Sequence, residues 1–338
     1  MIIIMNRLAP ESEVTAVVDK IRAAGLSEHV SRGAERTIIG AVGDERSLSP
    51  EMFESMPGVE RAMRVVREYR IVSRETHPQD SVVQVRGLAF GGPAWQVIAG
   101  PSAVESGAQV AAAARAAREA GCRLLHGGVF KQHPSPYGFQ GLGVEGIEQL
   151  IAAGRAEGLP VVSELADVRM LDVFLEQGVD VIQIGSRSMQ NVELLKEVGR
   201  LNKPVILKRG IAATLGDWLM AAEYIAAGGN HNIVFCERGI RSFEPAYRAT
   251  LDVSAIPLLK RETHLPVIVD PSHAAGKAWL VPALAKAALA AGADGLLLDM
   301  HPQPEAALCE ADQALTPAGL AALMAELRPL AQALGRSL

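Results

Sequence analysis

The stretch Pro204-Val-Ile-Leu-Lys-Arg-Gly210 determines how the rest of the chain is interpreted. Its apolar residues are typical of a buried strand, which runs directly into a lysine, an arginine and a glycine. Placing two cations at the end of a core strand is costly unless an anion meets them. Because α/β barrels bind ligands at the carboxyl ends of their strands, Lys208 is predicted to face a negatively charged small molecule.

Four other apolar runs follow the same pattern, and each ends in charged or imidazole side chains. They occupy residues 181–187, 232–238, 266–273 and 295–301. A single run of this kind would carry little weight, but their regular spacing predicts one site built from several strand ends.

From residue 95 onward, strand and helix patterns alternate. Strands are expected at 96–100, 122–127, 160–164, 181–185, 204–208, 232–237, 266–270 and 295–299. Helices are expected at 106–120, 144–157, 167–177, 190–198, 215–227, 252–260, 278–291 and 317–334. The alternation predicts a (β/α)8 barrel over residues 95–338. A doubly wound open sheet is the alternative, and the absence of a GxGxxG motif after the first strand counts against it.

Residues 1–75 are predicted to form a separate α+β unit. Strands at 1–6, 28–31, 37–42 and 63–66 with helices at 10–24 and 50–55 give the βαββαβ order of a ferredoxin-like domain. Because no catalytic cluster falls there, we expect a regulatory or oligomerising role, and a cap without further function is the alternative. Residues 76–94 are predicted to be a linker with a small hairpin or plug at one end of the barrel.

Composition limits the class of protein. The chain has 338 residues, 49% of them hydrophobic, with a formal net charge of −5. No basic block is present, so nucleic acid is not an expected partner. The three cysteines are not in paired spacings, which favours a reducing compartment over a disulfide framework. No apolar run has the length of a membrane helix, so no membrane association and a cytoplasmic location are expected.

Two kinds of side chain converge at the predicted strand ends. The cations are Lys131, Arg187, Lys208 and Arg238. They come from four different units, and together they suit a ligand that carries both a phosphate and a carboxylate. The alternative is that each forms a structural ion pair.

The second kind comprises oxygen and imidazole groups that suit a divalent metal. Asp270, His273, Asp299 and Glu310 combine hard carboxylates with one imidazole, a set that fits Mn²⁺, Fe²⁺ or Zn²⁺. The alternative for His273 is a hydrogen bond within its loop. Cys309 precedes a candidate ligand and is expected to point elsewhere.

Long motifs in the chain resemble one enzyme family. They include Ile98-Ala-Gly-Pro101, Phe139-Gln-Gly-Leu-Gly143, Lys203-Pro-Val-Ile-Leu-Lys-Arg-Gly210, Cys236-Glu-Arg-Gly-Ile-Arg241, Asp270-Pro-Ser-His273 and His301-Pro-Gln-Pro-Glu305. They resemble the 3-deoxy-D-arabino-heptulosonate 7-phosphate (DAHP) synthases, in the branch that is similar to KDO8P synthases and carries an N-terminal ferredoxin-like domain. The resemblance covers nearly the whole chain.

The resemblance implies an activity and a set of site residues. The family joins phosphoenolpyruvate (PEP) to erythrose 4-phosphate and releases phosphate, the first step of the shikimate pathway. The residues implied to bind PEP are Lys131, Arg187, Lys208, Arg238 and His126; those implied in catalysis are Lys131, His273 and Asp270; those implied to bind the acceptor are His133, Ser135 and Asp270. A homodimer or homotetramer is also implied.

The implied metal ligands are His273, Asp299, Glu310 and Ser102, and here the chain departs from the family pattern. Ser102 replaces a cysteine, and the aspartate and glutamate have exchanged places. A hydroxyl is a poorer ligand than a thiolate for a borderline metal, so Mn, Fe, Zn or Mg, bound weakly or not at all, are the alternatives.

Two further departures fall at the substrates. His126 stands where the family has an arginine before Gly-Gly, and His133-Pro134 replaces an arginine and a threonine. They leave open a different acceptor or anionic substrate in a specialised biosynthetic pathway, or a weakly catalytic regulatory or binding protein.

Overall fold

The structure is a computed structural model, which describes residues 1–32, 37–43, 48–63, 69–131 and 135–338. It divides into two compact units, Met1–Arg70 and Ile71–Leu338.

The first unit is a four-stranded antiparallel sheet with helices packed on it. Its elements are β1 (Ile2–Met5), α1 (Glu11–Ala23), β2 (Ser27–Arg32), β3 (Thr37–Val42), α2 (Glu51–Glu54) and β4 (Val59–Met63). The strands lie in the order β2-β3-β1-β4. The apolar face of α1, including Val17 and Ile21, is fully buried with Ile3 and Ile39 in one core. The predicted ferredoxin-like order is confirmed, although β4 begins at Val59, earlier than expected. Residues 64–66 of the expected strand lie outside the described residues.

The segment after residue 70 belongs to the second unit, although we expected the first unit to extend to residue 75. The backbone N–H groups of Ile71 and Val72 donate to the Glu223 carboxylate at 2.9 and 3.0 Å. Arg74 donates to the carbonyl oxygens of Lys260 and Thr263, each at 2.8 Å. These contacts join residues far apart in sequence, so no local pattern could have indicated them.

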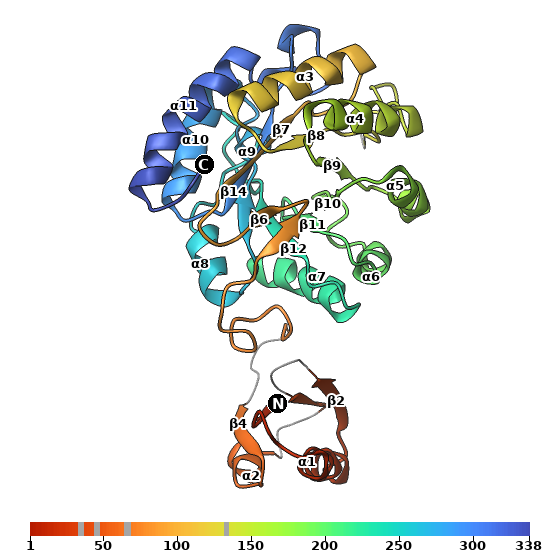
Figure 1. Ribbon diagram of the computed structural model, residues 1–338, viewed down its shortest axis with the longest axis vertical. Helices are drawn as coiled ribbons and strands as arrows, with labels where there is room; N and C mark the ends of the chain where they lie inside the picture. The colour runs from red at the N-terminus through yellow and green to blue at the C-terminus, as the bar shows by residue number, and fades with distance from the viewer. Residues whose placement is uncertain (33–36, 44–47, 64–68, 132–134) are drawn as a thin grey trace. The chain divides into compact units, whose positions relative to one another are not determined.

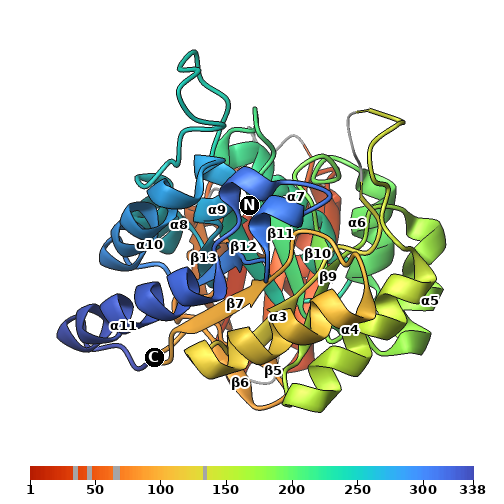
Figure 2. The same cartoon turned by 90° about the horizontal axis from the view of Figure 1, so that it is seen from above.

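The second unit is a closed barrel of parallel strands surrounded by helices (Figures 1 and 2). The strands are β7 (Gln96–Gly100), β8 (Leu124–His126), β9 (Val161–Glu164), β10 (Val181–Ile184), β11 (Val205–Lys208), β12 (Ile233–Glu237), β13 (Val267–Val269) and β14 (Gly295–Asp299). The helices that follow the strands around the barrel are α3 (Gly107–Ala120), α4 (Val144–Glu157), α5 (Leu171–Gln177), α6 (Val192–Gly199), α7 (Leu215–Ala227), α8 (Ala255–Glu262), α10 (Val281–Ala290) and α11 (Pro317–Ala333). The (β/α)8 prediction is confirmed.

The register of the strands brings their charged ends to one edge. Lys208 lies opposite Cys236 on β12, and Asp299 lies opposite Gly100 on β7. The tight β7–β8 contact requires glycine at position 100, since a Cβ there would lie 1.9 Å from the His126 carbonyl oxygen.

A hairpin of β5 (Val83–Val85) and β6 (Leu88–Phe90) closes the other end of the barrel. Val83, Val85 and Phe90 are buried in the same core cluster as side chains of the barrel strands. Arg86 pairs with Asp180, which directly precedes β10, so the hairpin lies at the amino-terminal ends of the strands. The carboxyl ends are therefore left for a binding site.

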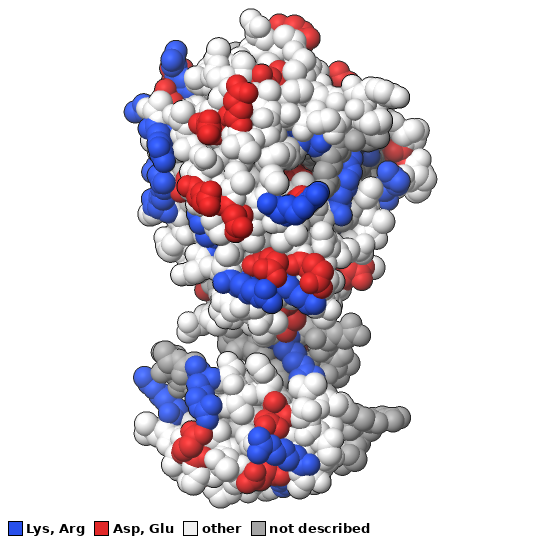
Figure 3. Space-filling view, turned by 90° about the vertical axis from the view of Figure 1, so that its right-hand side faces the viewer, with Lys and Arg blue, Asp and Glu red and all other residues white. Residues whose placement is uncertain are grey.

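The surface mixes both signs of charge. On the face in Figure 3, lysine and arginine side chains are interspersed with aspartate and glutamate. Among the described residues, the structure has no helix with both the length and the apolar character that a membrane span needs.

Candidate active site

A cavity of about 500 Å³ opens at the carboxyl ends of the barrel strands. All four predicted cations line it: Lys131, Arg187, Lys208 and Arg238. Lys208 is the last residue of β11, and the other three cations lie in the segments that follow β8, β10 and β12. The structure therefore brings together side chains that lie more than a hundred positions apart in the sequence, as the barrel topology requires.

Lys208 is the most deeply placed of these cations. It is 4% exposed, and its Nζ lies 2.6 Å from Oδ2 of Asp270, which is fully buried. Burial favours the neutral lysine, but the carboxylates of Asp270 and Asp299 outweigh it and raise the pKa of Lys208. For Asp270, burial is likewise outweighed, by His273 and Lys208, so its pKa lies well below the ordinary value. Both groups are therefore charged at neutral pH.

Lys131 and Arg238 donate hydrogen bonds to uncharged oxygens. Lys131 Nζ donates to both the carbonyl oxygen and Oγ of Ser102, each at 2.9 Å. Arg238 donates to the His273 carbonyl oxygen at 3.4 Å, and burial lowers its pKa. An anionic ligand would find these donors directed at a common space.

Arg209, the second cation of the opening stretch, has a structural role. Adjacent residues of a strand point to opposite faces, and Arg209 Nη1 lies 2.9 Å from both Glu237 and Asp252. Its guanidinium also lies over the Trp218 ring, 5.9 Å from the centroid. Only one of the two cations at the end of β11 is thus part of the cavity lining.

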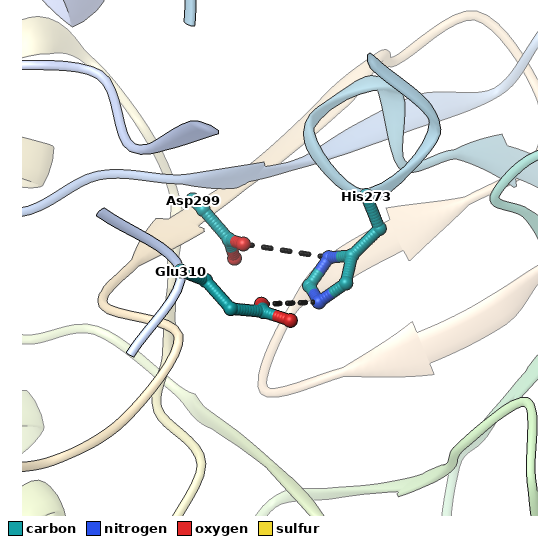
Figure 4. A group of neighbouring side chains, drawn as sticks. All are labelled: His273, Asp299 and Glu310. Carbon is teal, nitrogen blue, oxygen red and sulfur yellow. Dashed lines mark ion pairs between the residues drawn. The ribbon is translucent and has the colours of Figure 1, made fainter. Parts of the chain in front are cut away.

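His273, Asp299 and Glu310 form a compact cluster (Figure 4). One ligand atom from each lies within 4.8 Å of the others. His273 stands on the short helix α9 (Pro271–Ala275), whose N-cap Asp270 accepts the His273 N–H at 2.9 Å. The His273 ring presents Nε2 to Glu310 at 2.9 Å and Nδ1 to Asp299 at 3.4 Å.

The cluster fits a divalent cation. It offers one imidazole and two carboxylates, a donor set that suits Mn²⁺, Fe²⁺ or Zn²⁺. Asp299 is fully buried, and its Oδ1 has no hydrogen-bond partner among the described residues. A buried carboxylate oxygen normally has a partner, so this atom is consistent with metal ligation. Without a metal, burial acts against the imidazolium, but Asp270 and Glu310 raise the pKa of His273 to about 9.

Glu310 accepts hydrogen bonds from three other side chains. Ser102 Oγ and Gln313 Nε2 donate to its Oε2 at 2.7 and 3.0 Å, and Arg248 Nη1 donates to its Oε1 at 3.0 Å. Its backbone has φ 55°, an unusual conformation for glutamate. Ser102 therefore contacts the cluster through a hydrogen bond, and its role as a metal ligand stays a prediction.

Three residues of this region were missed or misplaced by sequence reasoning. Arg248 lies in a loop with no motif signal, and Gln313 is an uncharged residue beyond the predicted ligand Glu310. Cys309 lines the cavity, whereas we expected it to point elsewhere. The positive φ of Glu310 changes the direction of the chain at this point, so sequence spacing does not indicate where the neighbouring side chains lie.

The predicted acceptor residues are less clearly placed. His133 lies outside the described residues. Ser135 Oγ accepts the Tyr137 N–H at 3.3 Å and is not among the described residues that line the cavity. Asp270 reaches the site through Lys208 and His273. The acceptor assignments therefore stay predictions.

The fold and the cavity together define a barrel enzyme that acts on small anionic molecules. The family model "DAHP synthetase I family" matches residues 77–333, and the model "DAHP synthase ferredoxin-like domain" matches residues 1–67. The chain belongs to the DAHP synthetase I family.

Known proteins are similar over the whole length. A phospho-2-dehydro-3-deoxyheptonate aldolase from Thermotoga maritima is 43% identical over 335 residues, which is 99% of each chain. A crystal structure of the DAHP synthase from Thermotoga maritima has a TM-score of 0.80 at 42% identity and covers 99% of this chain and 98% of that one. A 2-dehydro-3-deoxyphosphooctonate aldolase from Syntrophotalea carbinolica is 33% identical, over 69% of this chain and 90% of its own.

These findings confirm the predicted family, fold and class of enzyme. The protein is a transferase that forms carbon–carbon bonds, and its full-length similarity supports the condensation of PEP with erythrose 4-phosphate at the start of the shikimate pathway. The roles of individual residues stay predictions.

Proposed function

We propose that Lys131, Arg187, Lys208 and Arg238 bind PEP, which this protein condenses with erythrose 4-phosphate. The observation that carries the proposal is their convergence in one cavity at the carboxyl end of the barrel. PEP carries a carboxylate and a phosphate on adjacent groups. Several cations directed at one space match that double charge better than separate ion pairs would.

The donor side of the reaction follows from this placement. The cations hold the carboxylate and the phosphate so that the PEP methylene carbon faces the acceptor aldehyde. The methylene carbon bonds to the aldehyde carbon, whose oxygen is protonated; water then adds to C2 of PEP and inorganic phosphate leaves. Fixing two reactants in line supplies much of the rate enhancement. Lys208, paired with Asp270, has a fixed position among the cations that orient PEP.

His273, Asp299 and Glu310 would hold a divalent metal, with Ser102 as a weaker oxygen donor nearby. The ion, once bound, would polarise the acceptor carbonyl as a Lewis acid. We infer that Mn²⁺, Fe²⁺, Zn²⁺ or Mg²⁺ is the bound ion. A hydroxyl in place of a thiolate shifts the metal preference of the site toward harder cations. Asp270 and His273, joined at 2.8 Å, are the catalytic candidates beside this cluster, together with Lys131.

A different acceptor is the second candidate function. His133 and Pro134 stand where the resemblance calls for an arginine and a threonine that hold the acceptor's phosphate. Replacing a permanent cation by an imidazole weakens a charge-assisted contact to phosphate by about 1–3 kcal/mol. An aldehyde with a smaller or uncharged end would lose less at this position than erythrose 4-phosphate does.

The decisive experiment measures phosphate release from PEP with a panel of aldehydes, after chelation and with each metal added back. We expect release with erythrose 4-phosphate or one related aldehyde, and a loss in Lys208→Met. Lys260→Met is the matched control, since Lys260 also pairs with a buried aspartate, Asp294, but lies outside the cavity. No turnover with any acceptor under any metal condition would refute the proposal.

We also propose that the protein is a cytoplasmic homodimer or homotetramer. In this assembly, the first unit would regulate activity or form the contacts between subunits. Truncation before Ile71 retains the contacts that bind residues 71–74 to Glu223, Lys260 and Thr263. We expect the truncated protein to keep its turnover and to lose feedback by an effector or its oligomeric state. A truncated form whose turnover, response to effectors and mass in solution all match the full chain would overturn this role.

A further inference from the structure

His126 is a buried imidazole whose Nδ1 has no hydrogen-bond partner among the residues that the structure describes. It ends β8, it is 3% exposed, and it lines the cavity. The described residues likewise make no hydrogen bond to its Nε2. Buried polar groups are nearly always hydrogen-bonded, so a ring left open toward a cavity points to a ligand.

The surroundings of His126 keep it neutral in the free protein. Burial is the first cause that holds its pKa well below the ordinary value, and Lys208, Lys131 and His273 act in the same direction. Asp270, at the end of β13, acts against them and is outweighed. The ring therefore lies in a locally positive field that disfavours an additional positive charge.

We propose that His126 takes up a proton from solvent when the doubly anionic donor binds in this cavity, so that donor binding and proton uptake are linked. The inference rests on the proposed function, since PEP is taken as the ligand. The donor's carboxylate and phosphate neutralise Lys131 and Lys208, which removes the repulsion. A ligand oxygen near the ring then gains a charge-assisted hydrogen bond from the imidazolium.

The position distinguishes this chain from the family pattern described above. An arginine there carries its charge in the free and bound states alike, so it gives no proton linkage. With histidine, the affinity for an anion depends on pH, because the bound state holds a proton that the free state lacks. His126 is thus a residue that sets how pH controls donor affinity.

The test is calorimetry of PEP binding to the full chain in two buffers of different ionisation enthalpy, with metal-free and with Mn²⁺-loaded protein. Wild-type protein is expected to take up more protons per PEP bound than His126→Gln does, by a difference that approaches about one. From pH 6.5 to 8.5, wild-type affinity should fall by as much as about tenfold per pH unit relative to His126→Gln. The titration of PEP itself cancels in this comparison.

Two further variants make the result specific. His126→Arg should bind PEP as tightly as wild-type at pH 6.5 and more tightly at pH 8.5, without the linked proton. His231→Asn, a change at an exposed histidine outside the cavity, should keep the wild-type linkage. Melting curves verify folding, and His126→Asn replaces the glutamine variant if that one does not fold.

The outcomes separate the two proposals. Equal proton uptake and equal pH slopes in wild-type and His126→Gln would overturn the linkage and leave the proposed function intact. Absence of PEP binding in every variant at every pH would instead overturn the proposed function.

Discussion

Two charged residues on opposite sides of the cavity, Lys208 and Glu310, are held in different ways. On the donor side, Lys208 stands on β11, and its Nζ lies 2.6 Å from Oδ2 of Asp270, which follows β13, two strands away in the barrel. On the cluster side, Glu310 stands on a loop with φ 55° and is held by Ser102, Gln313 and Arg248. A strand-borne charge is placed by the register of the barrel, whereas a loop-borne charge depends on individual side-chain contacts.

The departures from the family resemblance fall on both kinds of segment. His126 and Asp299 end strands β8 and β14, whereas Ser102 and Glu310 lie outside the strands. Lys208 differs from Glu310 in burial, since 4% of its side chain is exposed against 25% for Glu310. Because a more deeply buried charge loses more when its partner is removed, Lys208 should respond to mutation more severely than Glu310.

The largest effect is expected for Lys208→Met. Removing one partner of a buried pair leaves Asp270 without its lysine, which should destabilise the fold by about 3–5 kcal/mol. Loss of a fixed cation at the substrate should lower kcat/KM by about 10³-fold. Urea unfolding and phosphate release measure the two effects. If the kcat/KM of Lys208→Met stays within tenfold of wild-type, Lys208 is not more sensitive to mutation than Glu310.

A double-mutant cycle tests the exchanged carboxylates. Asp299→Glu adds a methylene to a fully buried position and should cost about 1–3 kcal/mol. Glu310→Asp shortens the reach to His273, although aspartate tolerates positive φ better. Each single change should reduce Mn²⁺ affinity about 10–100-fold by titration, and the double variant should recover most of it. Strictly additive losses would show that the two lengths are not matched to each other.

Arg248→Met probes the support of the loop-borne ligand. The Arg248–Glu310 pair is partly exposed, so its loss should change the free energy of unfolding by less than about 1 kcal/mol. The wider freedom of Glu310 should still lower kcat by about tenfold. Arg86→Met, which breaks the pair with Asp180 at the other end of the barrel, is the control and should leave kcat unchanged. A kcat equal to wild-type in Arg248→Met would show that Ser102 and Gln313 hold Glu310 without it.

The last effect needs no change to the chain and is expected in how the stability of the metal-free protein depends on pH. The pKa of His273 rises from 6.5 to about 9 in the folded state, because Asp270 and Glu310 outweigh the effect of burial. A raised pKa means that the folded state binds the proton more tightly. The stabilisation is thus complete below pH 6.5 and is lost as the pH rises through about 9. Chemical unfolding of chelated protein at several pH values should show this decline, and His273→Gln should lack it.

The sequence was sufficient to predict the barrel and its cations. The alternation of apolar strands with helical segments produced all the strands and connecting helices of residues 95–338, with boundaries shifted by a few positions. Because parallel strands end at one edge, Lys131, Arg187, Lys208 and Arg238 had to converge once the barrel was predicted. Periodicity and topology together therefore determine the donor side.

Only the tertiary structure decided the rest. It showed that Lys208 lines the cavity whereas Arg209 pairs with Glu237 outside it. It also assigned residues 71–75 to the barrel unit and placed Arg248, Gln313 and Cys309 at the site. It also revealed that Nδ1 of His126 has no hydrogen-bond partner among the described residues. These features depend on contacts between loops and on the backbone angle of single residues. Such contacts form between segments distant along the chain, and no local pattern of residue types encodes them.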